Sequence, residues 1–127
     1  MGAQLLWVFT SVNGRIGRQV YWLAWFFVLS MDVAILAAAV EVSIDPQTNV
    51  AQVNPPPGLM PFVAVISLPF QIVIGVKRLH DLNASGLFAI ALLIFPASVI
   101  ATLLLGIIPG RPGPNRFGDQ TDIMPPP

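Results

Sequence analysis

One stretch decides the fold of this chain: residues 20–40 read VYWLAWFFVLSMDVAILAAAV, with Asp32 as the one charged side chain. About twenty helical residues at ~1.5 Å per residue cross a hydrocarbon core of ~30 Å, so this run has the length of a transmembrane helix. Asp32 costs about 2.5 to 3.5 kcal/mol at mid-depth, whereas the Val, Leu, Ile and Phe residues of the run contribute about 3 to 6 kcal/mol in favour of insertion. The run is therefore predicted to span a membrane despite its acid.

The composition of the whole chain agrees with a membrane protein. Of its 127 residues, 55% are hydrophobic and only 9% are charged, against about 25% charged in an ordinary soluble domain. Six Lys or Arg residues balance six Asp or Glu residues, so no net charge favours nucleic acid as a partner. Because cysteine is absent and there is a single His, disulfides, thiolate sites and multi-histidine metal sites are excluded, and we expect no cofactor.

Two further apolar runs, residues 59–76 and 87–108, are of similar length. Because lipid offers the backbone no hydrogen-bond partners, helices are the expected form of all three runs. The sequence therefore predicts an all-α membrane protein, a small multi-pass bundle of three transmembrane helices over residues 20–108. Pro69 is expected to kink the second helix. Pro96 leaves two alternatives for the third run: a single crossing, which we favour, or a helical hairpin broken at that proline, whose halves of ~15 Å are too short to cross.

The positive charges indicate how the chain is oriented. Four basic residues flank one end of the first two runs: Arg15, Arg18, Lys77 and Arg78. Residues 41–58, between those runs, carry no Lys or Arg. By the positive-inside rule, the N-terminal segment, residues 1–19, is cytoplasmic, and residues 41–58 form a stiff, proline-rich loop on the other side.

The Gly- and Pro-rich tail, residues 109–127, carries Arg111 and Arg116. A single third crossing leaves this tail outside, whereas a hairpin broken at Pro96 returns it to the cytoplasm. Residues 110–119 read GRPGPNRFGD, in which glycines permit positive φ and prolines fix the backbone. Phe117, between charged neighbours, favours a docked plug over a flexible spacer.

Three polar side chains fall near mid-depth of the predicted helices: Asp32, Ser67 and Ser98. Ser67 and Ser98 each begin an i, i+4 polar pair, with Gln71 and Thr102 respectively. The functional interpretation of this layer is a proton or ion relay. The structural interpretation is a neutral Asp that hydrogen-bonds across helices and helps them pack. We favour the structural interpretation because no other acid or base lies inside the runs.

The junction between the second and third runs, KRLHDLNASG at residues 77–86, is dense in polar side chains. The side chains of His80 and Asp81 diverge by ~100° on a helix, so a catalytic pair between them is disfavoured. One interpretation is a polar helix end, with Ser85 as the N-cap of the next helix. The other is recognition of anionic lipid, at about 1 kcal/mol for each basic residue near the membrane surface.

Three segments carry a family resemblance: GRIGRQVYW at residues 14–22, RLHD at 78–81 with SG at 85–86, and GPNRFGD at 113–119. In the order, spacing and position of these segments beside the apolar runs, the chain resembles the bacterial inner-membrane family called domain of unknown function 805. It departs from the family pattern at Val12, Lys77, Leu87 and Thr121. The resemblance implies a small multi-pass helical protein of the bacterial inner membrane, with no established reaction and no catalytic residues. It also suggests one recurrent polar set that meets at a single membrane face: Arg15, Arg18, Arg78, His80, Asp81, Asn115 and Arg116.

We therefore expect a structural or interaction protein rather than an enzyme. Its juxtamembrane polar cluster is expected to bind a partner protein or anionic lipid headgroups, through Arg15, Arg18, Lys77, Arg78, His80, Asp81, Asn115 and Arg116. A homo-oligomer or a larger membrane protein is the expected partner within the bilayer. The alternative function is a subunit of an oligomeric transporter or channel that uses Asp32 in the mid-membrane polar layer. A membrane enzyme acting on a lipid, with His80 near Arg78, is a third hypothesis.

Overall fold

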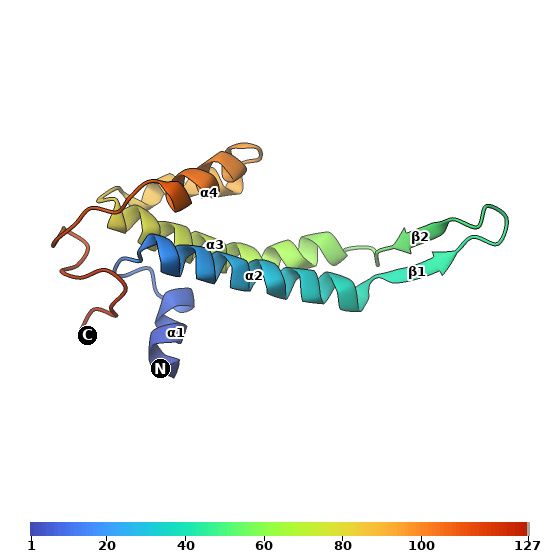
Figure 1. Ribbon diagram of the computed structural model, residues 1–127, viewed down its shortest axis with the longest axis horizontal. Coiled ribbons are helices and arrows are strands. Elements are labelled where there is room, and N and C mark those ends of the chain that lie inside the picture. The colour runs from blue at the N-terminus through green and yellow to red at the C-terminus, as the bar shows by residue number, and fades with distance from the viewer. Residues whose placement is uncertain (127) are drawn as a thin grey trace.

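The computed structural model describes residues 1–126; residue 127, the last residue of the predicted tail, lies outside the described part. The molecule is elongated, with two long helices side by side along its length (Figure 1). Its elements in chain order are α1 (Gly2–Thr10), α2 (Arg18–Ala39), β1 (Glu41–Ile44), β2 (Ala51–Asn54), α3 (Leu59–Asp81), the 3-10 helix η1 (Gly86–Leu93) and α4 (Ala97–Ile107).

The first two apolar runs form the two long helices. α2 has 22 residues and α3 has 23, with mean hydropathies of 1.9 and 2.2 in their most apolar segments, so both are long and apolar enough to cross a membrane. Only 11% and 28% of the residues in those segments are buried. Apolar surface exposed on this scale indicates a membrane location rather than a soluble core. α3 continues through Pro69 and ends at Asp81, so the polar junction begins inside the last turns of this helix.

The third apolar run does not form one continuous helix, which corrects the favoured expectation of a third crossing. η1 begins after Ser85, whose hydroxyl accepts a hydrogen bond from the backbone N–H of Leu87 (3.3 Å). The chain then turns at Pro96 and returns as α4, only 11 residues long. Proline lacks a backbone N–H and disfavours helical geometry in the residue before it, which explains the break. The alternative hairpin therefore describes the structure, and its two arms lie side by side against α3 (Figure 1).

Both ends of this helical hairpin lie at the same end of the α2–α3 pair. We call this the polar end; there α2 begins at Arg18, α3 ends at Asp81 and α4 ends at Ile107. The guanidinium of Arg18 donates to the carbonyl of Ile107 (3.5 Å), and the backbone N–H of Arg111 donates to the carbonyl of Asp81 (3.0 Å). The tail, which follows the helical hairpin, thus starts beside the end of α3, which precedes it.

A β-hairpin at the opposite end corrects the expectation of an all-α fold with a simple loop. β1 and β2 pair antiparallel, and all eight residues are exposed. One face carries apolar side chains, from Val42, Ile44, Ala51 and Val53, and the other carries Glu41, Ser43, Gln52 and Asn54. The β-branched residues recur with the period of two that favours a strand. In the turn, the backbone N–H of Gln47 donates to Asp45 (2.8 Å) and lowers the pKa of that carboxyl.

The second unexpected element is α1, which forms inside the predicted N-terminal segment and lies crosswise to α2 at the polar end (Figure 1). The core lies between α2, α3 and the helical hairpin. The helical hairpin formed by η1 and α4 packs closely against the long helices at two glycines. A Cβ at Gly106 would lie 2.1 Å from Cζ2 of the rigid Trp22 ring, so this contact requires glycine, and a Cβ at Gly75 would lie 2.4 Å from Leu92 Cδ1, so that leucine side chain would have to move.

Candidate functional site

Three segments that are far apart in the sequence meet at the polar end. They are the loop before α2, the last turns of α3 and the tail, which passes across the ends of both long helices (Figure 1). These segments contain the three motifs of the family resemblance. The recurrent polar set is therefore brought to one end of the molecule, as the resemblance suggests.

The carboxylate of Asp81 is the centre of this assembly. Oδ1 accepts hydrogen bonds from Nε of Arg15 (3.0 Å) and from the hydroxyl of Thr121 (2.8 Å), and Oδ2 accepts one from Nη1 of Arg78. The exposed fractions of Arg15, Arg78 and Asp81 are 1%, 0% and 2%, so the two ion pairs are shielded from solvent. We call these three residues the Arg15–Asp81–Arg78 clamp.

Arg78 also binds the carboxyl end of α4. Its Nε donates to the carbonyl of Leu105 (2.8 Å) and its Nη2 to that of Ile108 (2.5 Å). The last carbonyls of a helix have no partner within the helix and carry partial negative charge, which a buried cation can satisfy. Arg78 therefore fixes the return of the helical hairpin to the polar end.

Arg15 makes the corresponding contacts with the tail. Its Nη1 donates to the carbonyl of Gly113 (2.7 Å) and its Nη2 to that of Arg111 (2.6 Å). In the other direction, the backbone N–H of Asp122 donates to the carbonyl of Arg15 (3.0 Å), and Asp122 Oδ1 accepts from the N–H of Gly17 (2.6 Å). The tail is thus held by both side chains and backbone, as the docked-plug interpretation expects.

Lys77 binds α1 rather than a carboxylate. Its ammonium group is fully buried, donates to the carbonyl of Trp7 and lies 3.8 Å from the centroid of the Trp7 ring. A cation over an indole ring is attracted by the π-electrons. Because Trp7 is in the second half of α1, Lys77 also compensates carbonyl charge near the end of that helix.

His80 and Asp81 point to different neighbours, as their helical spacing predicts. The His80 ring stacks on Phe117 at a centroid distance of 3.8 Å and an interplanar angle of 6°, and its Nδ1 lies 3.1 Å from the carbonyl of Gly14. Asn115 Nδ2 donates to the carbonyl of His80 (2.8 Å). Since a carbonyl only accepts, this Nδ1 carries the proton. The arrangement holds the tail and forms no pair between His80 and Asp81.

The six basic residues of the chain all lie at the polar end, but they divide into two groups. Arg15, Lys77 and Arg78 are buried, and their charged groups contact Asp81, backbone carbonyls or the Trp7 ring. Exposed at the surface are Arg18, Arg111 and Arg116. The cationic groups available to a ligand at this end are therefore those of the three exposed arginines. Of these three, only Arg18 and Arg116 belong to the set predicted from the sequence.

The mid-membrane residues are only partly brought together. Asp32 has Ser67 of α3 as its polar neighbour, and its Oδ1 is buried without a hydrogen-bond partner among residues 1–126. Both lie fourteen residues from the polar end of their helices, about 21 Å along them. Ser98 is only nine residues before Ile107, about 14 Å along α4. The predicted layer therefore contains Asp32 and Ser67, and Ser98 lies nearer the polar end.

Sequence reasoning missed several residues that build this site. Trp7 and Asp122 are absent from the predicted set, although each binds one of the three segments. Gly110 is a third, since a Cβ there would lie 1.9 Å from Asp81 Oδ2. The cluster of glycines around the tail arginines is the one sequence signal that could have indicated such close packing. Within the described residues, no group of three or more His, Asp and Glu side chains could hold a metal ion.

Replacing Asp81 by Asn is expected to destabilise the protein strongly. Asn keeps the size but removes the charge that two buried arginines need, and breaking a buried ion pair costs about 3 to 5 kcal/mol. We expect lower accumulation in membranes and earlier thermal unfolding in detergent. Asp119→Asn, the same change at an exposed site, is the control. Equal unfolding temperatures for the two variants would contradict a clamping role for Asp81.

The sequence matches the family described as "Protein of unknown function (DUF805)" over residues 9–119. The matched region includes the clamp, His80 and the tail arginines, and it ends before Thr121 and Asp122. No curated protein and no solved structure matches the chain. Because the family match covers most of the 127 residues, the chain belongs to the DUF805 family of proteins of unknown function.

Proposed function

We propose that this protein is a non-enzymatic, two-span protein of the bacterial inner membrane whose polar end faces the cytoplasm and binds anionic lipid headgroups. The single observation that carries the proposal is the placement of charge. All six basic residues lie at the polar end, while Glu41 and Asp45 lie at the β-hairpin end. Lys and Arg concentrate on the cytoplasmic side of membrane proteins, and the returning tail brings Arg111 and Arg116 to that side as well.

The exposed arginines supply the binding chemistry in this proposal. Arg18, Arg111 and Arg116 are each exposed at the polar end, where α2 begins and where this proposal places the phosphate groups of the bilayer. The buried cations do not contribute, because Asp81, backbone carbonyls and the Trp7 ring already contact them. The clamp therefore supports the fold, and the three exposed arginines interact with lipid.

Single-cysteine labelling tests the orientation. The chain has no cysteine, so Thr48→Cys in the β-hairpin turn and Asp119→Cys in the tail each add one thiol at an exposed position. We expect a membrane-impermeant maleimide to label the first in intact spheroplasts and the second only after permeabilisation. Labelling of both cysteines from the same side would contradict two crossings. Labelling of Asp119→Cys alone in intact spheroplasts would show that the orientation is the reverse of the proposed one.

Neutralising the exposed arginines tests lipid binding. The triple variant Arg18→Gln, Arg111→Gln and Arg116→Gln is expected to reduce enrichment of phosphatidylglycerol about fivefold or more, since each basic residue near the surface contributes about 1 kcal/mol. The measurement is the ratio of phosphatidylglycerol to phosphatidylethanolamine in copolymer-extracted membrane discs, determined by mass spectrometry.

Asp119→Asn is the control for this experiment, because it changes the charge of the tail in the opposite direction at an exposed position. It is expected to leave enrichment unchanged or to raise it. The triple variant should unfold near the temperature of the unmodified protein, since the contacts of these side chains in the fold are two hydrogen bonds of 3.5 Å and the exposed stacking of the Arg116 guanidinium on Phe117 (4.6 Å to the ring centroid). Undiminished enrichment in a folded triple variant would refute headgroup binding by these arginines.

A second candidate function, a subunit of an oligomeric transporter or channel, is favoured by Asp32. Its buried Oδ1 has no hydrogen-bond partner among the described residues, and Ser67 is the one polar side chain of α3 beside this carboxyl. Intramembrane acids of this kind mark ion or proton pathways. In this alternative, other copies or a larger protein complete the pathway.

Proton flux into liposomes separates this candidate from the first. The transporter function predicts flux that is abolished in Asp32→Asn and kept in Ser30→Ala, whose hydroxyl bonds only the carbonyl of Phe26 on the same helix (2.7 Å). Equal flux in the unmodified protein and Asp32→Asn would remove Asp32 from any transport mechanism and leave its role as a packing residue.

A further inference from the structure

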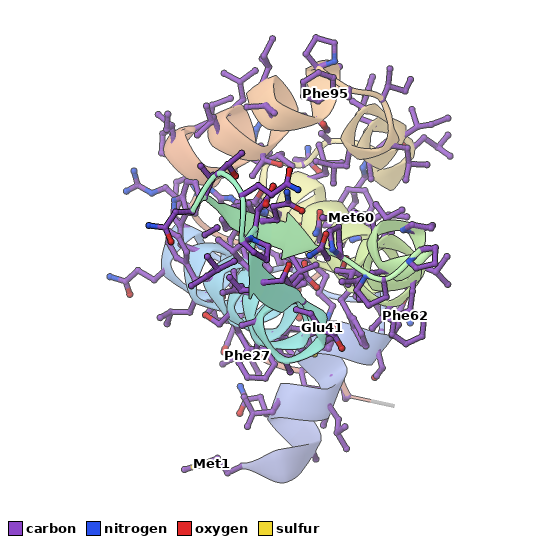
Figure 2. The ribbon with its side chains drawn as sticks, turned by 90° about the vertical axis from the view of Figure 1, so that its right-hand side faces the viewer. Met1, Phe27, Glu41, Met60, Phe62 and Phe95 are labelled. Carbon is purple, nitrogen blue, oxygen red and sulfur yellow. The ribbon has the colours of Figure 1, made fainter. Side chains whose placement is uncertain are left out.

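An apolar groove of about 810 Å³ lies between α1 and α2, on the opposite side of the α2–α3 pair from α4. Figure 2 shows Phe27 on the side of α2 that faces α1, and Met1 at the far end of α1. The main lining residues are Leu6 and Phe9 from α1, Leu23, Phe27 and Met31 from α2, and Phe70 from α3. None of these side chains has a charged or hydroxyl group.

Contacts on several sides keep this groove open. Lys77 holds Trp7 against the end of α3, and Gln4 Nε2 donates to the carbonyl of Asp122 in the tail (2.9 Å). Phe9 contacts the rings of Phe27 and Phe70 at centroid distances of 5.4 and 6.1 Å, which separates α1 from the rest of α2. α1 therefore cannot pack closer to α2 without breaking these contacts.

The length and depth of the groove match one leaflet of a bilayer. On α2 its lining extends from Val20 to Met31, twelve residues with a rise of about 17 Å from the first to the last. One leaflet of a ~30 Å hydrocarbon core is about 15 Å deep. The polar lining residues are Gln4, Thr10 and Asp122, and the hydroxyl of Thr10 donates to the carbonyl of Leu6 within α1 (2.7 Å). The α2 and α3 side of the groove is therefore apolar, and Gln4 and Asp122 leave polar groups at its rim.

We propose that the groove holds one acyl chain of a membrane phospholipid, with the headgroup at the rim near Gln4 and Asp122 and the terminal methyl toward Met31. This inference rests on the membrane orientation proposed above. Water does not fill an apolar space that offers it no hydrogen-bond partners, and an unfilled space would lose dispersion contacts along its whole lining. A second copy's spanning helix would contact the full length of α2, whereas the lining of the groove on α2 ends at Met31, eight residues before the helix ends at Ala39.

Filling the groove tests the proposal. The protein, purified in mild detergent, is expected to retain one phospholipid per chain in native mass spectrometry. Leu23→Trp is expected to lower that occupancy about tenfold, which corresponds to ~1.4 kcal/mol or to excluding about two methylene groups. Leu29→Trp is the matched control, because Leu29 is exposed on the same helix outside the groove. Retention of no lipid by the unmodified protein, or equal retention by both variants, would overturn the proposal.

A second measurement uses the unmodified chain and is independent of how the variants fold. A phospholipid with a photoreactive acyl chain is expected to crosslink to Leu23, Phe27 and Met31 more strongly than to Leu29 and Val33, which are exposed on α2 outside the groove. Equal labelling around α2 would mean ordinary contact with bulk lipid and would overturn the site. Crosslinks between two copies through α1 would assign the groove to a dimer instead. Side-specific labelling of Thr48→Cys and Asp119→Cys reports the orientation separately, so a wrong orientation and a wrong site can be distinguished.

Discussion

The carboxylate of Asp81, placed between two buried guanidinium groups, is the interaction on which the polar end depends. It joins the loop before α2, the end of α3 and the tail, and it is the one acid among four buried charged residues of this end. The remaining positive charge is compensated by carbonyls at the carboxyl ends of α4 and α1. Arg78 is compensated by the carboxyl end of α4, so this contact depends on the return of the third apolar run to the polar end.

In the proposed function, this arrangement separates stability from recognition at one end of the molecule. Buried arginines bound to a carboxylate and to carbonyls are costly to expose, so their contribution is to the fold. Arginines at the surface remain hydrated and cost little to bring near a phosphate group. Under this proposal the same residue type has two roles, and burial decides between them. Position in the sequence does not, since Arg15 and Arg18 are three residues apart and differ in role.

Sequence reasoning predicts the parts of the structure that depend on local chemistry and misses those that depend on assembly. Apolar length predicts α2 and α3, helical spacing predicts the divergence of His80 and Asp81, and a capping serine predicts the start of η1. The sequence predicts a helical hairpin broken at Pro96 only as an alternative to a third crossing. The contacts of Arg78 with α4, which the sequence does not reveal, decide between the two. The contributions of Trp7 and Asp122 have no local signal, because each arises from a contact with a distant segment.

The short helical hairpin also gives the molecule an uneven cross-section. η1 and α4 lie beside the half of the α2–α3 pair that is next to the polar end, whereas only the two long helices continue to the β-hairpin (Figure 1). In a bilayer, such a body takes up more area in one monolayer than in the other. Lipids around the protein are least strained where the membrane is curved and the monolayer that contains the wider half of the protein is on the convex side. A tapered shape of this kind couples where the protein accumulates to local membrane curvature, whatever it binds.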